Sequence, residues 1–248
     1  MNFFIEAFNV ILYQPLFNAL IFLYQVIPDF GIAVIALTAL IRLLLYPSTA
    51  KSIKSQQAMS EIQPKVKEIQ DKYDDDKEKQ AQEMMELYQD KNVNPFSGCL
   101  PLLVQLPILI GLFRVFYRGF EQEQMKYLYS FVSNPGVIDQ SFLGLVNLAE
   151  PNAVMAVLAG VFQFFQTKTS TASTPQSGDD SGFGAMFKKQ MIYLFPVITV
   201  FIVWRLPSAI ALYWITTTMF MVAQQYYLKN KKSDEEEQEE DSENTEED

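Results

Sequence analysis

The run from Phe30 to Pro47 constrains the fold more than any other part of the chain, because Arg42 is its only charged residue. A bilayer core about 30 Å thick needs roughly 20 apolar helical residues, so a run of 18 residues is long enough to span it. Pro47 and the polar residues that follow it predict the end of the span. Arg42 precedes Pro47 by five residues, which puts it about 7 Å inside that end.

An arginine at this depth has two interpretations. Its insertion into hydrocarbon costs a few kcal/mol unless water or a polar partner reaches the guanidinium. In the first interpretation, the long side chain of Arg42 extends to the nearby interface and keeps its charge in water. In the second, Arg42 lines a wet cavity inside the protein. The polar residues elsewhere in the chain distinguish between the two.

Hydrophobic residues make up 49% of the 248 residues, and five runs are long and apolar enough to span a bilayer. Pro101 and Pro107 are tolerated in the second run, where neighbouring helices can satisfy the freed carbonyl groups. The chain is therefore expected to be an all-α membrane protein. Its expected spans are residues 30–47, 98–117, 151–167, 190–204 and 209–228. They belong to one core of residues 29–228, which also carries a helical hairpin between the first two spans.

Composition restricts the classes of function. The chain has no histidine, which excludes histidine-based catalysis and histidine metal sites, and its single Cys99 has no partner for an internal disulfide. The sequence contains no GxSxG motif and no pair of carboxylates within the spans, so we expect neither an enzyme nor a cofactor.

Two regions outside the spans are expected to be helical without crossing the bilayer. Residues 1–28 carry an apolar stripe interrupted by polar groups, which predicts amphipathic helices in the membrane interface, with an extra span as the alternative. Residues 51–94 are rich in charge, and apolar residues at helical spacing on both sides of the DDDK segment predict a hairpin of two helices. Pro64 is expected to kink the first helix or to start a new one, and Asp75 or Asp76 to cap the second.

Lysine and arginine set the expected orientation. The hairpin, a glycine- and serine-rich loop expected to be flexible at 168–189, and the stretch after the fifth span together hold fourteen of them, whereas the opposite side holds three. We therefore expect these segments in the cytoplasm and the N-terminus outside. Residues 229–248 are expected to form a basic anchor followed by an acidic tail that is disordered by composition. The net charge of −10 becomes +1 once the eleven acids of this tail are set aside.

With this topology, polar side chains of several spans fall in the same leaflet. Arg42, Gln105, Gln163 and Gln166 are all expected in the inner halves of their spans, and Gln163 and Gln166 share one helix face. The outer parts of the same spans are almost wholly apolar. This distribution favours the wet cavity, and it predicts five helices around a hydrophilic groove that opens to the cytoplasm.

Four segments follow one another between about Leu16 and Leu228: ALIRLLLYP, EIQPKVKEIQDKYDDDKEKQAQEMMELYQDKNVNPFSGCLPLLVQLPILIGLF, GVFQFFQTK and LPSAIALYW. In order and spacing they resemble the YidC branch of the Oxa-type membrane protein insertases. The resemblance is to the shorter form of the family, which has five spans and lacks the large periplasmic domain of many other members.

The resemblance implies a protein of the bacterial cell membrane that moves hydrophobic segments of nascent proteins into the bilayer without nucleotide hydrolysis. It implies that a positive residue at Arg42 lies in the groove, that Gln166 and Trp214 line it, and that the second and fifth spans form an apolar exit path. It also implies early contact between substrate and the cytoplasmic hairpin. Expected partners are nascent membrane proteins, lipid, the Sec translocon and the translating ribosome, with no specific nucleic acid.

A small-anion transporter or channel that uses Arg42 as its binding site is the alternative. Transporters of that kind often show inverted repeats and further intramembrane charges. The sequence has neither an internal repeat nor a second charged pair within the spans, which disfavours this alternative.

Overall fold

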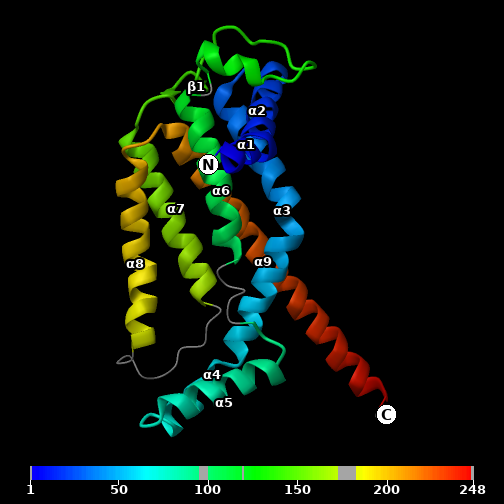
Figure 1. Cartoon of the computed structure of the whole chain (residues 1–248). Helices are drawn as coiled ribbons and strands as arrows, with labels where there is room; N and C mark the ends of the chain where they lie inside the picture. Colours follow the sequence, from blue (N-terminus) through cyan, green and yellow to red (C-terminus); the bar gives the residue numbers. More distant parts are fainter. Residues whose placement is uncertain (1, 95–99, 119, 173–182, 247–248) are drawn as a thin grey trace.

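The computed structural model describes residues 2–94, 100–118, 120–172 and 183–246. Helices dominate these residues, as Figure 1 shows. The elements are α1 (Asn2–Phe8), the π-helix η1 (Asn9–Tyr13), α2 (Gln14–Val26), α3 (Phe30–Glu61), α4 (Gln63–Lys72), α5 (Lys77–Asp90), α6 (Leu100–Arg118), the 3-10 helix η3 (Gln122–Tyr127), β1 (Ser141–Phe142), β2 (Val146–Asn147), α7 (Ala153–Ala172), α8 (Phe183–Val203) and α9 (Ser208–Glu246).

Helices α3, α6, α7, α8 and α9 form a bundle, with the α4–α5 hairpin at one end and β1 with the residues that precede it at the other (Figure 1). Helix α9 packs against both α3 and α7, while α8 packs on α7. The core between them is apolar and fully buried at its centre, where aromatic rings supply much of the volume. Its largest buried side chains are Tyr13, Phe17, Phe30, Leu112 and Tyr213.

Helix α3 continues past Pro47, the predicted end of the span, as far as Glu61. The segment after Pro47 is polar and lies beyond the apolar run, so hydropathy marked the expected exit from hydrocarbon rather than the end of the helix. Thr49 donates hydrogen bonds to the carbonyls of Leu45 and Tyr46, both at 3.1 Å, and supports the turn that contains the proline.

The helices on either side of the expected 168–189 loop are also longer than predicted. Helix α7 continues to Ala172 and α8 begins at Phe183, so the parts of that loop at 168–172 and 183–189 are helical, and residues 173–182 lie outside the described residues.

The expectation of a disordered acidic tail is wrong, because α9 continues to Glu246. Glutamate is a good helix former, and a helix that is already nucleated upstream extends at little cost.

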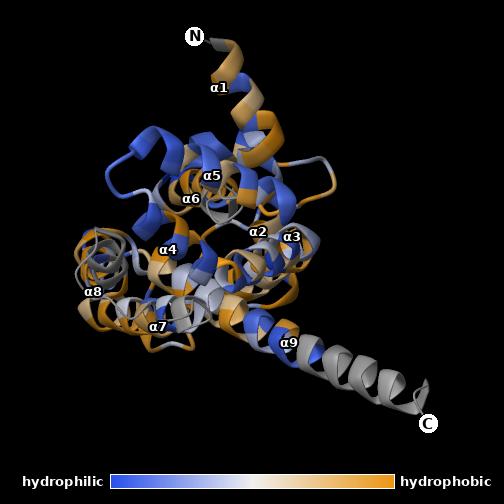
Figure 2. Cartoon of the chain, turned by 90° about the horizontal axis from the view of Figure 1, so that it is seen from below, coloured by the Kyte–Doolittle hydropathy of each residue, from blue (hydrophilic) through white to orange (hydrophobic). Residues whose placement is uncertain are grey.

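The N-terminal segment is helical from Asn2 to Val26. Pro15 lies in the first turn of α2, where a missing N–H is tolerated. Length and composition alone make Phe3–Val26 and Phe30–Glu61 candidate membrane spans among the described residues. In Figure 2, α1 is seen along its length whereas α8 is seen nearly end-on, so α1 runs across the direction of the bundle.

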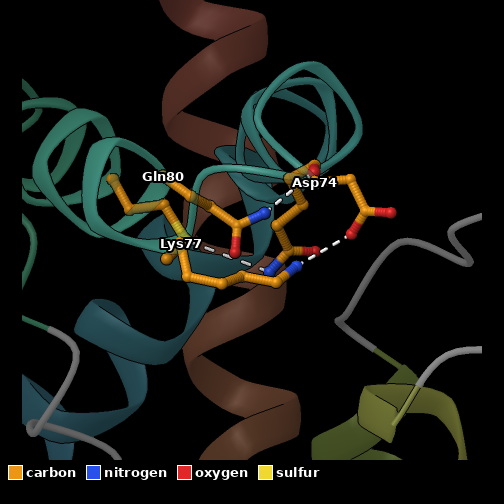
Figure 3. A network of polar contacts seen from close by, with 5 residues as sticks. Asp74, Lys77 and Gln80 are labelled. Carbon is orange, nitrogen blue, oxygen red and sulfur yellow. Dashed lines mark hydrogen bonds and ion pairs between the residues drawn. The ribbon is translucent and has the colours of Figure 1, made fainter.

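Of the charged hairpin predicted at 51–94, residues 51–61 instead extend α3, and α4 and α5 form the two helices that are joined by a turn. Pro64 lies in the first turn of α4, and the Asp76 carboxylate accepts the backbone N–H of Lys79 at 3.0 Å, as expected of a helix cap. Figure 3 shows the polar contacts at the turn, where Lys77 donates to Asp74 at 2.8 Å and Gln80 donates to the carbonyl of Gln70 at 2.8 Å. The hydrogen bond and charge of Lys77 lower the pKa of the exposed Asp74 carboxyl.

The chain is not purely helical as expected, because it contains a short β-hairpin whose strands have two residues each. Strands β1 and β2 are antiparallel, with Phe142 opposite Val146. Leu143 and Gly144 between them have φ angles of 51° and 68°. The left-handed conformation costs a residue with a Cβ roughly 1–2 kcal/mol, so a leucine there is unusual. A Cβ added to Gly31 would lie 2.1 Å from Cδ2 of Phe142, so only glycine lets the hairpin pack on α3.

We predict that Gly160→Ala destabilises the contact between α7 and α8. A Cβ at Gly160 would lie 2.2 Å from Cγ2 of Val200 and 3.2 Å from the carbonyl oxygen of Pro196. Overpacking of this kind costs about 1–3 kcal/mol, which exceeds the gain of about 1 kcal/mol in helix propensity. Thermal unfolding in detergent should show a lower midpoint for Gly160→Ala and partial recovery when Val200→Ala is added; a raised midpoint in the single variant would contradict the close approach.

We also predict that α4 and α5 exchange their amide hydrogens faster than α7 and α9. The hairpin has only a small cluster of its own, in which Ile62, Val66 and Val93 are buried, and α5 has no buried residue. Segments with few buried contacts open at low free energy. Hydrogen exchange of the full chain in lipid nanodiscs measures this directly, and equal protection in the hairpin and the bundle would refute it.

Candidate functional site

Arg42 lies at the meeting point of three helices. It is only 7% exposed, and its guanidinium donates a hydrogen bond to the side-chain oxygen of Gln105 on α6. The amide nitrogen of Gln105 in turn donates to the hydroxyl of Tyr213 on α9 at 2.5 Å. The structure therefore brings together Arg42 and Gln105, two of the residues predicted for the site, and adds Tyr213 as a third member.

The guanidinium of Arg42 is hydrogen-bonded to a neutral group, the side-chain amide of Gln105. Its Nε is buried and has no hydrogen-bond partner within the described part of the chain. A buried cation without a carboxylate nearby attracts anions strongly, because little solvent screens it. A pocket lies beside it between α3 and α6 and extends toward the hairpin end of α3. It is lined by Arg42, Leu45, Ser48, Thr49, Val104 and Gln105.

A second cluster of polar side chains joins α7 to α9. The indole N–H of Trp214 donates to the side-chain oxygen of Gln163 at 2.7 Å, and Gln163 is 6% exposed. The amide nitrogen of Gln163 donates to Gln166 at 3.0 Å, and that of Gln166 donates to Ser170 at 3.1 Å. Gln225 also donates to the Ser170 hydroxyl, at 2.5 Å. This cluster is uncharged and consists of amides, hydroxyls and one indole.

The five predicted residues thus form two neighbouring clusters rather than one continuous lining. Tyr213 and Trp214 are consecutive, and consecutive residues of an α-helix point about 100° apart. Tyr213 therefore lies on the side of α9 that contacts α3 and α6, while Trp214 lies on the side that contacts α7. Helix α9 separates the charged cluster from the neutral one.

A third polar contact lies closer to the hairpin, between α3 and α9. The side chain of Gln224 donates to the Thr49 hydroxyl at 2.8 Å and to the carbonyl oxygen of Tyr46 at 3.3 Å. Thr49 lies seven residues after Arg42, which places both on the same face of α3. Polar contacts therefore continue from Arg42 toward the end of the bundle that carries the hairpin.

The predicted site did not include several members of these clusters, among them Tyr213, Thr49 and Ser170. Heptad spacing from Arg42 is a signal that would have found Thr49, and spacing of four from Gln166 would have found Ser170. Tyr213 carried no such signal, because a tyrosine in an apolar helix is ordinarily a core residue. No group of three or more histidine, cysteine, aspartate or glutamate side chains gathers among the residues with described positions, so the site's chemistry rests on one guanidinium and neutral polar groups.

The comparisons with known proteins agree with this architecture. The family model described as "60Kd inner membrane protein" matches residues 22–236. A relative from Listeria monocytogenes serotype 4b (strain F2365), "Membrane protein insertase YidC 1", is 36% identical over 196 residues, which are 77% of this chain and 61% of that protein. The "Membrane protein insertase YidC" of Endomicrobium trichonymphae is 33% identical over 204 residues, 82% of this chain and 36% of that protein.

A solved structure is similar as well. It is titled "Active YidC insertase crystal structure with the first transmembrane domain resolved", and it aligns with a TM-score of 0.61 and 29% identity over 87% of this chain and 46% of that one. The chain spans between 36% and 61% of the length of these two curated relatives. The family description and the bacterial relatives imply a location in a bacterial inner membrane. With a family model that covers most of its length, the chain belongs to the YidC family of 60Kd inner membrane proteins.

Proposed function

We propose that this chain is a membrane protein insertase that moves hydrophobic segments of nascent proteins from the cytoplasm into the lipid bilayer. The observation that carries the proposal is the buried Arg42, whose hydrogen-bond partner is a neutral amide and which has a pocket beside it. A cation held in this way can attract an acidic segment into the membrane and then release it, since no covalent step is needed.

Five helices are proposed to cross the bilayer. Helices α6, α7 and α8 have 19, 20 and 21 residues, and a helix of that length covers roughly 30 Å. Large apolar side chains are exposed along the bundle, as expected of a surface that faces lipid rather than water. Examples are Leu43 and Leu44 on α3, Ile110 on α6, Val154 on α7 and Phe201 on α8, which are 55–72% exposed.

The proposed groove opens toward the cytoplasm, on the side of the hairpin. The lysine-rich hairpin sets this orientation, with the N-terminus outside and the C-terminus inside. Arg42, the pocket residues Ser48 and Thr49, and the contact between Thr49 and Gln224 all lie on the path from the bundle centre to that end. The path supports entry of a substrate from the cytoplasmic side.

The energetics fit a substrate with a short acidic tail. One aspartate at the centre of a membrane helix costs about 3 kcal/mol on insertion scales. A carboxylate about 4 Å from a cation gains roughly 4 kcal/mol at an effective dielectric constant of about 20. Arg42 therefore offsets about one acidic residue at a time, which is enough to draw a tail part-way but too little to trap it.

Release follows from apolar burial. A transmembrane segment gains about 25 cal/mol for each Å² of apolar surface that it removes from water, so its helix leaves the groove for lipid once it is in place. Helices α6 and α9 flank Arg42 and are proposed as the apolar exit path. The small-anion transporter gains no support from this arrangement, since the sequence shows no inverted repeat of the kind on which many transporters are built.

The proposed organisation has three parts. Residues 1–28 form helices at the outer interface, supported by the transverse course of α1 in Figure 2, residues 29–228 form the insertase core with its hairpin, and residues 229–248 form a cytoplasmic basic and acidic extension. The proposed partners are nascent membrane proteins and lipid, with the Sec translocon and the translating ribosome as further partners suggested by the family resemblance. Lys229 and Lys231 directly follow the apolar part of α9 on the proposed cytoplasmic side, where they suit anionic headgroups.

We predict that Arg42→Ala lowers the insertion rate of a single-span substrate with two acidic residues in its translocated tail by about tenfold or more, since each 1.4 kcal/mol is a factor of ten. Arg42→Lys should retain much of the rate, because the charge matters more than the guanidinium fork in this role. The measurement is protease protection of the tail after insertion into liposomes that contain the purified full chain.

The matched control for this prediction is Arg118→Ala, which removes an exposed arginine at the outer end of α6. That variant should insert both substrates at the wild-type rate, and a substrate whose tail has been made neutral should be nearly insensitive to Arg42→Ala. Equal losses for acidic and neutral tails would mean that Arg42 serves the fold rather than charge attraction.

We predict a different pattern for the neutral cluster. Trp214→Phe keeps an aromatic ring but leaves the buried oxygen of Gln163 without its donor, which costs about 1–3 kcal/mol. Insertion should therefore fall for acidic and neutral tails alike, with a lower unfolding midpoint. Trp204→Phe, at a tryptophan that is 55% exposed, is the control and should change neither quantity. A loss confined to acidic tails would show that the two clusters act as one.

A further inference from the structure

The β-hairpin at the outer end of the bundle presents two leucines to its surroundings. Leu143 and Leu145 are 57% and 83% exposed. They belong to the turn Phe142–Leu145, which is closed by a hydrogen bond from the N–H of Leu145 to the carbonyl of Phe142 at 2.9 Å. Exposed leucines in so short a turn need a physical reason.

The backbone of the turn works against a leucine. Leu143 and Gly144 both have positive φ, at 51° and 68°, as in the turns that favour Asn-Gly at these two positions. A leucine pays a conformational penalty there that asparagine largely avoids. Residues that conflict with their local backbone preference are expected at functional or strained sites, so the side chain of Leu143 is a candidate for a role of its own.

The turn is held rigidly against the start of α3. The N–H of Leu143 donates to one carboxylate oxygen of Asp29 at 2.7 Å, and the other oxygen of Asp29 accepts the N–H of Ile32 at 2.8 Å as the N-cap of α3. The ring of Phe142 packs on Gly31. The turn therefore moves with α3 rather than as a free loop.

This attachment fixes the depth of the turn. Asp29 directly precedes the apolar run of α3, so the turn lies level with the outer end of that span. The chain has no lysine or arginine between Lys126 and Lys168, so attraction to anionic headgroups does not hold this region. The surrounding material at this level is the boundary between headgroups and acyl chains.

We propose that Leu143 and Leu145 form an outer anchor that inserts into the acyl-chain boundary of the outer leaflet. The proposal rests on the bilayer placement given under the proposed function. Through Asp29 the anchor sets the height of α3 in the membrane, and with it that of Arg42, which lies 13 residues further along the helix, or roughly 20 Å deeper.

The test uses the full chain with Cys99→Ser, reconstituted into phosphatidylcholine vesicles and spin-labelled at Leu145→Cys. Collision with oxygen, which concentrates in lipid, is compared with collision with a water-soluble nickel chelate. Leu43→Cys provides the lipid reference, and Gln122→Cys in the exposed outer segment provides the aqueous reference. The ratio of oxygen to nickel collisions at Leu145→Cys should exceed the aqueous reference several-fold and should not change at high salt.

A second variant separates the anchor from the fold. Leu143→Asn relieves the backbone penalty, so its unfolding midpoint in detergent should equal or exceed that of the parent, while the label at Leu145→Cys should become several-fold more accessible to nickel in vesicles. A lower midpoint with an unchanged label would mean that Leu143 only supports the hairpin, and would overturn the proposal.

The remaining outcomes are also decisive. If the label at Leu145→Cys matches the aqueous reference while Leu43→Cys is protected from nickel, the anchor is refuted and the proposed function stands. If Leu43→Cys is itself accessible to nickel, the bilayer placement of α3 fails together with the anchor. Protection that appears only after another protein is added, and not in lipid alone, would overturn the anchor in favour of a protein contact.

Discussion

The burial of one guanidinium governs how this bundle can be arranged. A charge away from water must be surrounded by polar groups, and Arg42 obtains them from two other helices, directly from Gln105 and through it from Tyr213. Helix α9 must therefore lie against α3, while its own Trp214 ties it to Gln163 on α7. One consecutive pair of aromatic residues thus fixes α9 as the element between the two sides of the bundle.

The two clusters differ in what they can do. The cluster around Arg42 carries a charge and has a pocket beside it, so under the proposed function it is the part that responds to the charge of a substrate's tail. The cluster around Gln163 contains only neutral groups joined by side-chain hydrogen bonds, and networks of that kind mainly make packing specific. The charged cluster and the neutral cluster therefore lie on opposite sides of a single helix, α9.

Hydropathy predicted the helical class and placed Arg42 and Gln105 at the same depth, and the two side chains are indeed hydrogen-bonded. It did not predict where helices end, since α3 and α9 continue as polar helices beyond the apolar runs. Spacing along one helix could not show that Gln105 and Gln163 face different neighbours, which depends on packing between helices. The strained turn at Leu143 escaped prediction because leucine has no preference for that backbone.

The unbroken course of α3 has a mechanical meaning. Its 32 residues make a rod roughly 48 Å long that holds the outer turn at one end, Arg42 near its middle and the hairpin at the other end. Pro47 lies in this rod five residues past Arg42, and its missing N–H leaves one helical hydrogen bond unmade. Helices bend most readily at such a residue. Any bend of α3 is therefore expected between Arg42 and the hairpin, which leaves the guanidinium and its contact with Gln105 in the part of the rod that packs within the bundle.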